Sequence, residues 1–139
     1  MTARRVAPPK SVRLRSAVPT FLAEDVAATA RWYDQFLGFR LAGHAPAGEP
    51  FVYASLRRDD AEIMLLSLSG YRKPDLSGLR PSGLWDAYFR MEGVRALYET
   101  VRDEPFVKMP LKKQSYGDWE FELRDPNGYV LTFGGDAGD

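Results

Sequence analysis

Cysteine is absent from this 139-residue chain, and histidine occurs only once, at His44. The chain can therefore form no disulfide, and it offers no thiolate as a metal ligand or nucleophile. Lys and Arg number 19, as do Asp and Glu, so the balance lacks the basic excess that is typical of nucleic-acid-binding proteins. No apolar run has the length of a membrane span, and no signal-type segment is evident. We expect a cytoplasmic protein with neither nucleic acid nor membrane as a partner.

Residues 1–16 differ from the rest of the chain in charge, because they include five Lys or Arg residues and no acid. We interpret this segment as a solvent-exposed basic tail. The alternation of apolar and basic residues over 12–15 leaves a second interpretation open. In that one, the tail adds an edge strand or packs on a partner subunit or an anionic surface.

The segment 17–68 has the pattern of a strand, a helix and three strands. Asp25 can accept hydrogen bonds from the first turn of the helix, and Gly38 is a stop signal at its end. The predicted buried stripe of this helix consists of Val26, Ala30, Tyr33 and Leu37. The strands are predicted at 17–22, 39–43, 51–57 and 61–68.

The same order of elements returns after a connector, 69–84, that is rich in Gly and Pro. A strand at 85–91 precedes a second helical stripe, and an extended segment follows at 106–113. Two strands, 116–124 and 129–133, then flank the turn Asp125-Pro126-Asn127-Gly128. The second stripe consists of Val94, Leu97, Tyr98 and Val101.

A single offset of 68 residues relates the two halves. It matches Val26 with Val94, Ile63 with Leu131 and, within the sheets, Tyr53 with Phe121, as well as further pairs. Internal duplication explains such a match better than chance. We predict an α+β fold in which tandem βαβββ modules, at about 17–68 and 85–134, build one domain over 17–135. The modules should form a curved mixed sheet with the helices on its outer face and the inner face open to a ligand.

These features resemble the vicinal oxygen chelate superfamily, also called the glyoxalase, bleomycin-resistance and extradiol dioxygenase superfamily. The resemblance covers residues 17 to 135. It is carried by Val18–Phe21, Asp25-Val26, Trp32-Tyr33, Leu37-Gly38-Phe39, Tyr116-Gly117, Glu120-Phe121 and Arg124–Gly128. The resemblance implies four equivalent sheet positions, two in each half, where His, Gln or Glu usually bind a divalent metal.

In this chain the four positions are Val18, Met64, Asp86 and Thr132, and only Asp86 is a credible metal ligand. We therefore expect no metal and no other cofactor. The resemblance is closest to the metal-free, bleomycin-resistance-like proteins. It implies a homodimer that sequesters a small molecule in a cleft between subunits and catalyses no reaction.

Strand alternation predicts which side chains face that cleft. They combine aromatic, apolar and acidic groups, which suit a planar organic ligand, and the carboxylates favour a cationic one. The predicted ligand-binding residues are Val18, Thr20, Met64, Asp86, Tyr88, Arg90, Tyr116, Glu120 and Thr132, with no catalytic residue among them.

Several alternatives stay open at this point. Asp86 pairs with Arg90 in one, and Glu120 and Glu122 are solvated strand residues in another. Asp86 and Glu120 also admit an interpretation as a general acid and base. At the level of function, the alternatives are a superfamily lyase or dioxygenase with an atypical metal site, and an interaction module whose cleft is filled by side chains.

Overall fold

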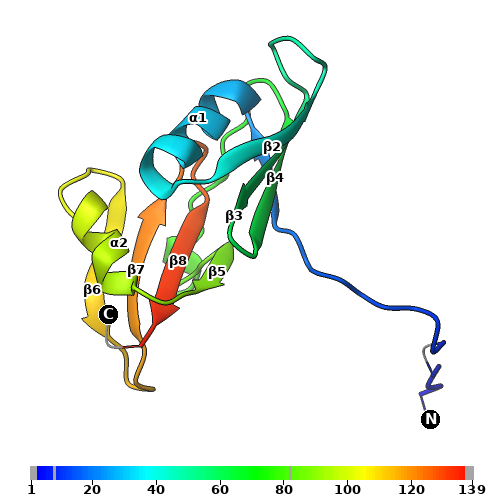
Figure 1. Cartoon of the computed structure of the whole chain (residues 1–139). Helices are drawn as coiled ribbons and strands as arrows, with labels where there is room; N and C mark the ends of the chain where they lie inside the picture. Colours follow the sequence, from blue (N-terminus) through cyan, green and yellow to red (C-terminus); the bar gives the residue numbers. More distant parts are fainter. Residues whose placement is uncertain (1–2, 8, 82, 137–139) are drawn as a thin grey trace.

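The computed structural model describes residues 3–7, 9–81 and 83–136, and it confirms the α+β fold with two βαβββ halves (Figure 1). The first half consists of β1 (Thr20–Ala23), α1 (Val26–Leu37), β2 (Arg40–Ala45), β3 (Tyr53–Arg58) and β4 (Ala61–Ser67). The second consists of β5 (Ala87–Arg90), α2 (Val94–Val101), β6 (Val107–Lys113), β7 (Trp119–Arg124) and β8 (Val130–Gly135). A short 3-10 helix, η1 (Ser77–Leu79), lies in the linker between them.

Each half contributes a four-stranded mixed sheet, in the orders β1-β4-β3-β2 and β5-β8-β7-β6. In each sheet the first strand pairs in parallel with the last, and the other neighbours are antiparallel. A parallel pair requires a crossover, and in each half the chain makes this crossover with its helix and two intervening strands. The helices pack on the face of each sheet that contributes to the shared core.

The strand registers show how far the internal repeat extends. Thr20 lies opposite Met64, and Tyr88 lies opposite Thr132, so both partners shift by 68 residues. The hairpins differ, because Asp59 and Asp60 close the first turn whereas three residues, 126–128, separate Asp125 from its partner Tyr129 in the second. The predicted match of Tyr53 with Phe121 is therefore wrong by one residue. By register, Glu120 occupies the position of Tyr53.

Helix α1 begins and ends as its sequence predicts. The carboxylate of Asp25 accepts a hydrogen bond from the Ala28 N–H at 3.0 Å, and Gly38 ends the helix in the left-handed conformation, with φ 70°. Helix α2 is shorter, and Val94 and Val101 are its buried residues. Both predicted stripes thus face the sheets, although Leu97 and Tyr98 are only partly buried.

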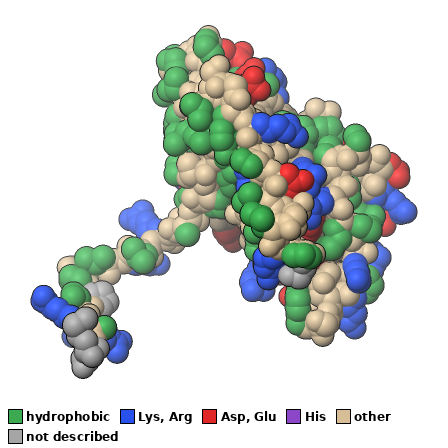
Figure 2. Space-filling model, turned by 180° about the vertical axis from the view of Figure 1, so that it is seen from behind, with side chains coloured by type: hydrophobic (Ala, Val, Ile, Leu, Met, Phe, Trp, Pro, Cys, Tyr) green, Lys and Arg blue, Asp and Glu red, His purple; other side chains and the backbone are tan. Residues whose placement is uncertain are grey.

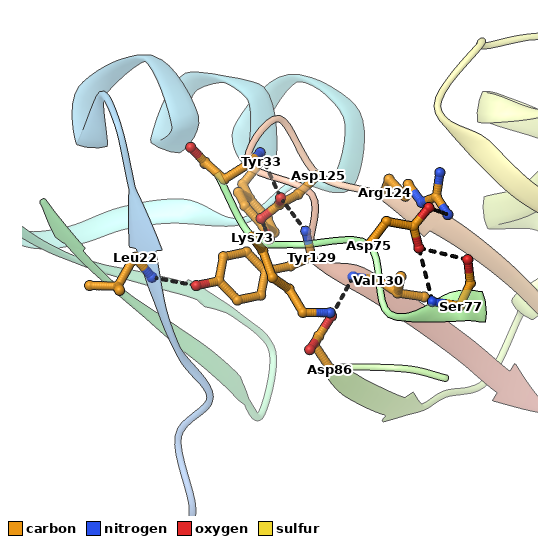
Figure 3. A network of polar contacts seen from close by, with 11 residues as sticks. Leu22, Tyr33, Lys73, Asp75, Ser77, Asp86, Arg124, Asp125, Tyr129 and Val130 are labelled. Atoms are coloured by element: carbon orange, nitrogen blue, oxygen red, sulfur yellow. Dashed lines mark hydrogen bonds and ion pairs between the residues drawn. The ribbon is translucent and has the colours of Figure 1, made fainter. Parts of the chain in front are cut away.

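The second hairpin turn joins the two halves by packing beneath α1 (Figure 3). The Tyr33 hydroxyl donates to the Asp125 carboxylate at 2.8 Å, and the Leu22 N–H donates to the Tyr129 hydroxyl at 3.0 Å. The Tyr129 ring also stacks on Phe21, with 4.2 Å between centroids. The two halves consequently share one core. Burial raises the pKa of Asp125, although hydrogen bonds from Tyr33 and from backbone N–H groups oppose this effect.

The linker follows the outside of this turn. The Lys73 N–H donates to the Asn127 carbonyl at 2.9 Å, and Arg72 reaches the Pro126 carbonyl at 3.3 Å. Gly128 permits this close approach, because its φ is 93° and a Cβ there would lie 3.0 Å from the Lys73 carbonyl oxygen. The linker is thereby held at one end of the second sheet.

The N-terminal segment runs away from both halves in Figure 1. Its described residues up to position 17 are exposed and contain no strand, whereas residues 1, 2 and 8 lie outside the described part of the chain. The first strand begins at Thr20, so Val18 precedes it. Among the described helices, none has the length and apolar character needed to cross a membrane.

Candidate functional site

The second sheet separates apolar and polar side chains between its two faces. One face is buried against the helices and the first half. Its residues are Ala87, Phe89, Phe121, Leu123, Leu131 and Phe133. The opposite face, called the open face below, is formed by the alternate residues of β5, β7 and β8. Its residues include Tyr88, Arg90, Glu120, Glu122 and Thr132.

A carboxylate that receives two tyrosine hydroxyls lies at one end of this open face. Tyr88 and Tyr116 each donate to the same Glu120 oxygen, Oε2, at 2.5 Å. Glu120 itself is only 3% exposed, and within the described residues no Lys or Arg forms an ion pair with it. We call these three residues the Glu120 cluster.

The pKa values of both tyrosines in the Glu120 cluster are raised. Desolvation of the Tyr116 hydroxyl, together with its hydrogen bond to Glu120, raises its pKa to about 12. The pKa of Tyr88 is raised further by the same two causes. Both hydroxyls therefore act as hydrogen-bond donors at neutral pH. The prediction that Glu120 is a solvated strand residue is excluded by its burial.

Gly134 provides the space for the Glu120 cluster. It lies opposite Glu120 in the β7–β8 pair, and a Cβ at this position would overlap the Tyr88 hydroxyl. A glycine is therefore required if Tyr88 is to reach across β8 to Glu120. Strand alternation puts Gly134 on the same face as Thr132, but it does not show that Tyr88 needs the space that a side chain at this position would fill.

Aromatic and cationic groups border the cluster. The Trp85 ring lies 5.5 Å from the Tyr88 ring, centroid to centroid, and the Arg90 guanidinium carbon lies 5.4 Å from the Tyr88 centroid. Tyr116 precedes β7 instead of lying in it, and its side chain is largely exposed. The cluster thus combines a buried acceptor with partly exposed aromatic surface.

Thr132 lies at the centre of the open face, in register with Tyr88 on one side and Glu122 on the other. It is 0% exposed, and its hydroxyl has no hydrogen-bond partner among the described residues. Glu122 is also buried, and Lys108 binds it at 3.1 Å. The interpretation of Glu122 as a solvated residue is therefore wrong.

Asp86 lies just before β5, at the opposite end of the open face from Glu120. Its carboxylate accepts from the Lys73 ammonium at 2.7 Å and from the Val130 N–H at 2.8 Å. The predicted pairing of Asp86 with Arg90 is therefore replaced by one with the linker. Sequence reasoning missed Lys73, because a single Lys in a breaker-rich connector has no periodicity to reveal its position.

The structure separates the predicted site residues into two groups. Thr20 and Met64 are paired in the first sheet, and Val18 is close to them, since the Thr20 hydroxyl donates to its carbonyl at 3.2 Å. The other six residues belong to the second half. Within the described residues, no side-chain hydrogen bond or ion pair links the two groups. Asp86 and Glu120 also lie four residues apart along β8, roughly 13 Å, which is too far for a shared proton transfer.

The four equivalent metal positions do not fit a divalent metal. Asp86 is committed to Lys73, whose ammonium places a positive charge where a cation would be needed. Val18 and Met64 offer no nitrogen or oxygen side-chain donor, and Thr132 offers only a hydroxyl. Among the described residues, no group of three or more His, Asp or Glu side chains is placed to hold a metal.

Residues 17–133 match the family model of the Glyoxalase/Bleomycin resistance protein/Dioxygenase superfamily. The chain belongs to this superfamily. The match spans both halves and the linker, and it confirms the resemblance that the sequence motifs indicated. A comparison with curated proteins finds no match.

Several solved structures have the same fold as this chain, at low sequence identity. TioX from Micromonospora sp. ML1 is 18% identical with a TM-score of 0.68, over 84% of this chain and 94% of that one. A bleomycin-binding protein complexed with bleomycin is 19% identical with a TM-score of 0.64, over 88% of this chain and 99% of that one. A glyoxalase-related enzyme from Clostridium phytofermentans is 16% identical with a TM-score of 0.70, over 92% of this chain and 99% of that one. At these identities the likeness extends to the fold alone.

Proposed function

We propose that the protein is a metal-free binding protein that sequesters a planar, cationic organic molecule, in the manner of the bleomycin-resistance proteins of its superfamily. The observation that carries the proposal is the Glu120 cluster. A buried carboxylate is costly unless it is paired with a charge or fully hydrogen-bonded. Both tyrosines donate to Oε2, which leaves Oε1 for a cationic group of a ligand.

The surroundings of Glu120 support a planar ligand. Trp85, Tyr88 and Tyr116 offer aromatic surface within reach of the carboxylate, and aromatic faces attract both flat rings and cations. The bleomycin-binding structure of the same fold was solved with bleomycin bound. That likeness motivates bleomycin-type glycopeptides as first probes, alongside other planar organic cations.

We further propose that two subunits build each cleft together. The first sheet has a corresponding open face, opposite the core face that contains Ile63 and Leu65. It carries Met64, which is half-buried, and Leu66, which is 41% exposed. Figure 2 shows hydrophobic side chains gathered on the upper left of the molecule as seen from behind. Apolar surface of this kind favours association with a second copy. Light scattering at micromolar concentration tests this, and a monomeric mass would contradict it.

The binding proposal is tested by calorimetry and thermal shift with bleomycin-type glycopeptides, planar organic cations, neutral analogues of these and divalent metals. We expect stabilisation by cationic compounds and none by metals. Glu120→Gln keeps the shape of the side chain and removes its charge, so affinity for the cation should fall at least about tenfold, the equivalent of 1.4 kcal/mol. Glu62→Gln, on the open face of the first half, is the matched control and should bind like the wild type. Unchanged binding by Glu120→Gln, or stabilisation by metal alone, contradicts the proposal.

The alternative, a lyase or dioxygenase with an atypical metal site, has less support. It requires a metal at positions whose side chains do not fit one, and whose only carboxylate binds Lys73. Stoichiometric metal in the purified protein, combined with turnover of a candidate substrate, would favour the enzyme.

A further inference from the structure

A pocket lies at the end of the open face opposite the Glu120 cluster, between the linker and the end of the second sheet. It has a volume of about 350 Å³ and includes Val130, Gly128 and several linker residues in its wall. None of the residues of the Glu120 cluster lines it. Four basic side chains do, namely Arg72, Lys73, Lys108 and Arg124. Among the described residues of this wall, Asp75 is the only acidic one.

The two lysines of this pocket are partly buried and retain unused donors. The side chains of Lys73 and Lys108 are 11% and 21% exposed, and each forms one ion pair, with Asp86 and Glu122 respectively. An ammonium has three N–H donors, and one hydrogen bond is formed by each of these groups. Each lysine therefore has donors left for a further acceptor.

Arg124 has a partner that a ligand could replace. Its guanidinium approaches the Asp75 carboxylate at 3.4 Å, a long contact between partly exposed groups. Asp75 also accepts at 2.6 Å from the Ser77 hydroxyl, so the linker holds this carboxylate at the pocket (Figure 3). The hydrogen bonds from Ser77 lower the pKa of Asp75, which keeps it ionised at neutral pH. The linker thus presents a carboxylate to Arg124, and this is the contact that an oxyanion would form in its place.

The local charge favours an anion even when the carboxylates that form ion pairs with these cations are counted. Four cations line the pocket, and three carboxylates contact them, from Asp75, Asp86 and Glu122. One positive charge is left over, in a site walled on one side by the linker. Displacement of Asp75 from Arg124 would increase the excess to two.

We propose that this pocket binds an oxyanion, that is, a phosphate, sulfate or carboxylate group of a small molecule. Lys73 and Lys108 supply their unused donors, and Arg124 exchanges its contact with Asp75 for one with the anion. The proposal goes beyond the binding of a cation at Glu120 and does not rest on it. Val130 in the pocket wall and Gly134 beneath Glu120 are four residues apart on β8, roughly 13 Å. A single ligand with charges of both signs would therefore need about this separation between them.

The test uses inorganic phosphate and inorganic sulfate as probes on the full chain, with sodium chloride at equal ionic strength as the reference. Thermal shift and calorimetry should show saturable, millimolar binding of phosphate to the wild type. Arg124→Gln should weaken this binding at least about tenfold. Arg57→Gln is the matched control, because Arg57 occupies the equivalent position in the first half and should leave the phosphate affinity unchanged.

Two further variants keep the result interpretable. Arg72→Gln removes an exposed pocket cation without touching the sheet, and it should weaken phosphate binding even if Arg124→Gln unfolds. Glu120→Gln should bind phosphate normally, so failure of the proposed cation site and failure of this oxyanion site are separable. Equal stabilisation by chloride and phosphate would overturn the proposal, as would equal losses in Arg57→Gln and Arg124→Gln.

Discussion

The two halves of the molecule have the same backbone topology, but the side chains on their open faces differ. Their helix-facing positions are apolar in both, as Phe21 and Phe89 or Leu65 and Phe133 illustrate. Their open-face positions differ in kind. The strand registers match four open-face positions of the first half with four of the second. The pairs are Tyr53 with Glu120, Ser55 with Glu122, Met64 with Thr132 and Leu66 with Gly134.

This difference separates what the duplicated fold requires from what has been added to it. The helix-facing side chains fill one shared core, so substitution there is limited to apolar residues of similar volume. The open face carries no such requirement. In the first half it is uncharged at these four positions. In the second it carries two buried carboxylates, a hydroxyl without a partner among the described residues, and the glycine that makes room for Tyr88. Ligand chemistry is therefore expected mainly in the second half.

The largest expected effect comes from the turn that only the second half inserts into the first. Asp125→Ala removes the acceptor for Tyr33 and for two backbone N–H groups, and it should destabilise the protein by about 3 kcal/mol. Asp60→Ala, in the exposed turn of the first half, should change stability by less than about 0.5 kcal/mol. Urea denaturation measures both. Similar values for the two variants would show that the turns are equivalent after all.

A somewhat smaller effect is expected at Gly134, which lies against the Glu120 cluster. Gly134→Ala should cost about 2 kcal/mol through overpacking against Tyr88, and it should also abolish binding of the organic cation. Gly43→Ala, on the edge strand of the first half, meets open space and should stabilise the protein by about 0.5 kcal/mol. Normal ligand binding by Gly134→Ala would exclude a role for the Tyr88–Glu120 hydrogen bond.

The buried hydroxyl of Thr132 predicts a modest gain. Thr132→Val replaces a hydroxyl that has no partner in the described part of the chain by a methyl group of similar shape. Stability should rise by about 1 kcal/mol in thermal or chemical denaturation. Met64→Leu at the equivalent position should stay within about 1 kcal/mol of the wild type. A loss of stability in Thr132→Val would mean that the hydroxyl has a partner in solution.

The last effect is absent at neutral pH and is expected only as a difference in alkaline pH dependence. Desolvation raises the pKa of Tyr129 from 10.0 to about 12 in the folded protein. Because the folded state holds this proton more tightly, the resulting stability is fully present below pH 10 and is lost as the pH rises toward 12. Tyr129→Phe should therefore show a shallower decline across this window than the wild type. Tyr53→Phe in the first half is the control, and an equal change in both variants would contradict the assignment.

The architecture was predictable because apolar periodicity and turn chemistry agree over the whole chain. The stripes that contain Val26 and Val94 differ by the same offset that relates the strand registers, so one repeat fixed both the order of elements and the burial of their faces. The superfamily followed from the same motifs. The one-residue shift between the third strands was not predictable, since it depends on the turn at 126–128 holding one residue more than its counterpart.

The candidate site was predictable only in outline. Alternation correctly placed Tyr88, Glu120 and Thr132 on one face, but it does not predict their hydrogen-bond or ion-pair partners. Lys73 comes from a segment without periodicity, and its pairing with Asp86 depends on the path of the linker in three dimensions. The burial of Glu120 likewise depends on Tyr116, which reaches it from a turn outside the strand.

The hydrogen bond between Tyr33 and Asp125 has a consequence for biosynthesis. Its two residues are 92 positions apart in the chain. A ribosome that adds 5 to 20 residues per second needs roughly 5 to 18 s to cover that distance. During this interval the first helix has emerged without the turn that closes its core. The nascent first half must then wait with apolar surface exposed, and we expect it to complete its fold only near the end of translation.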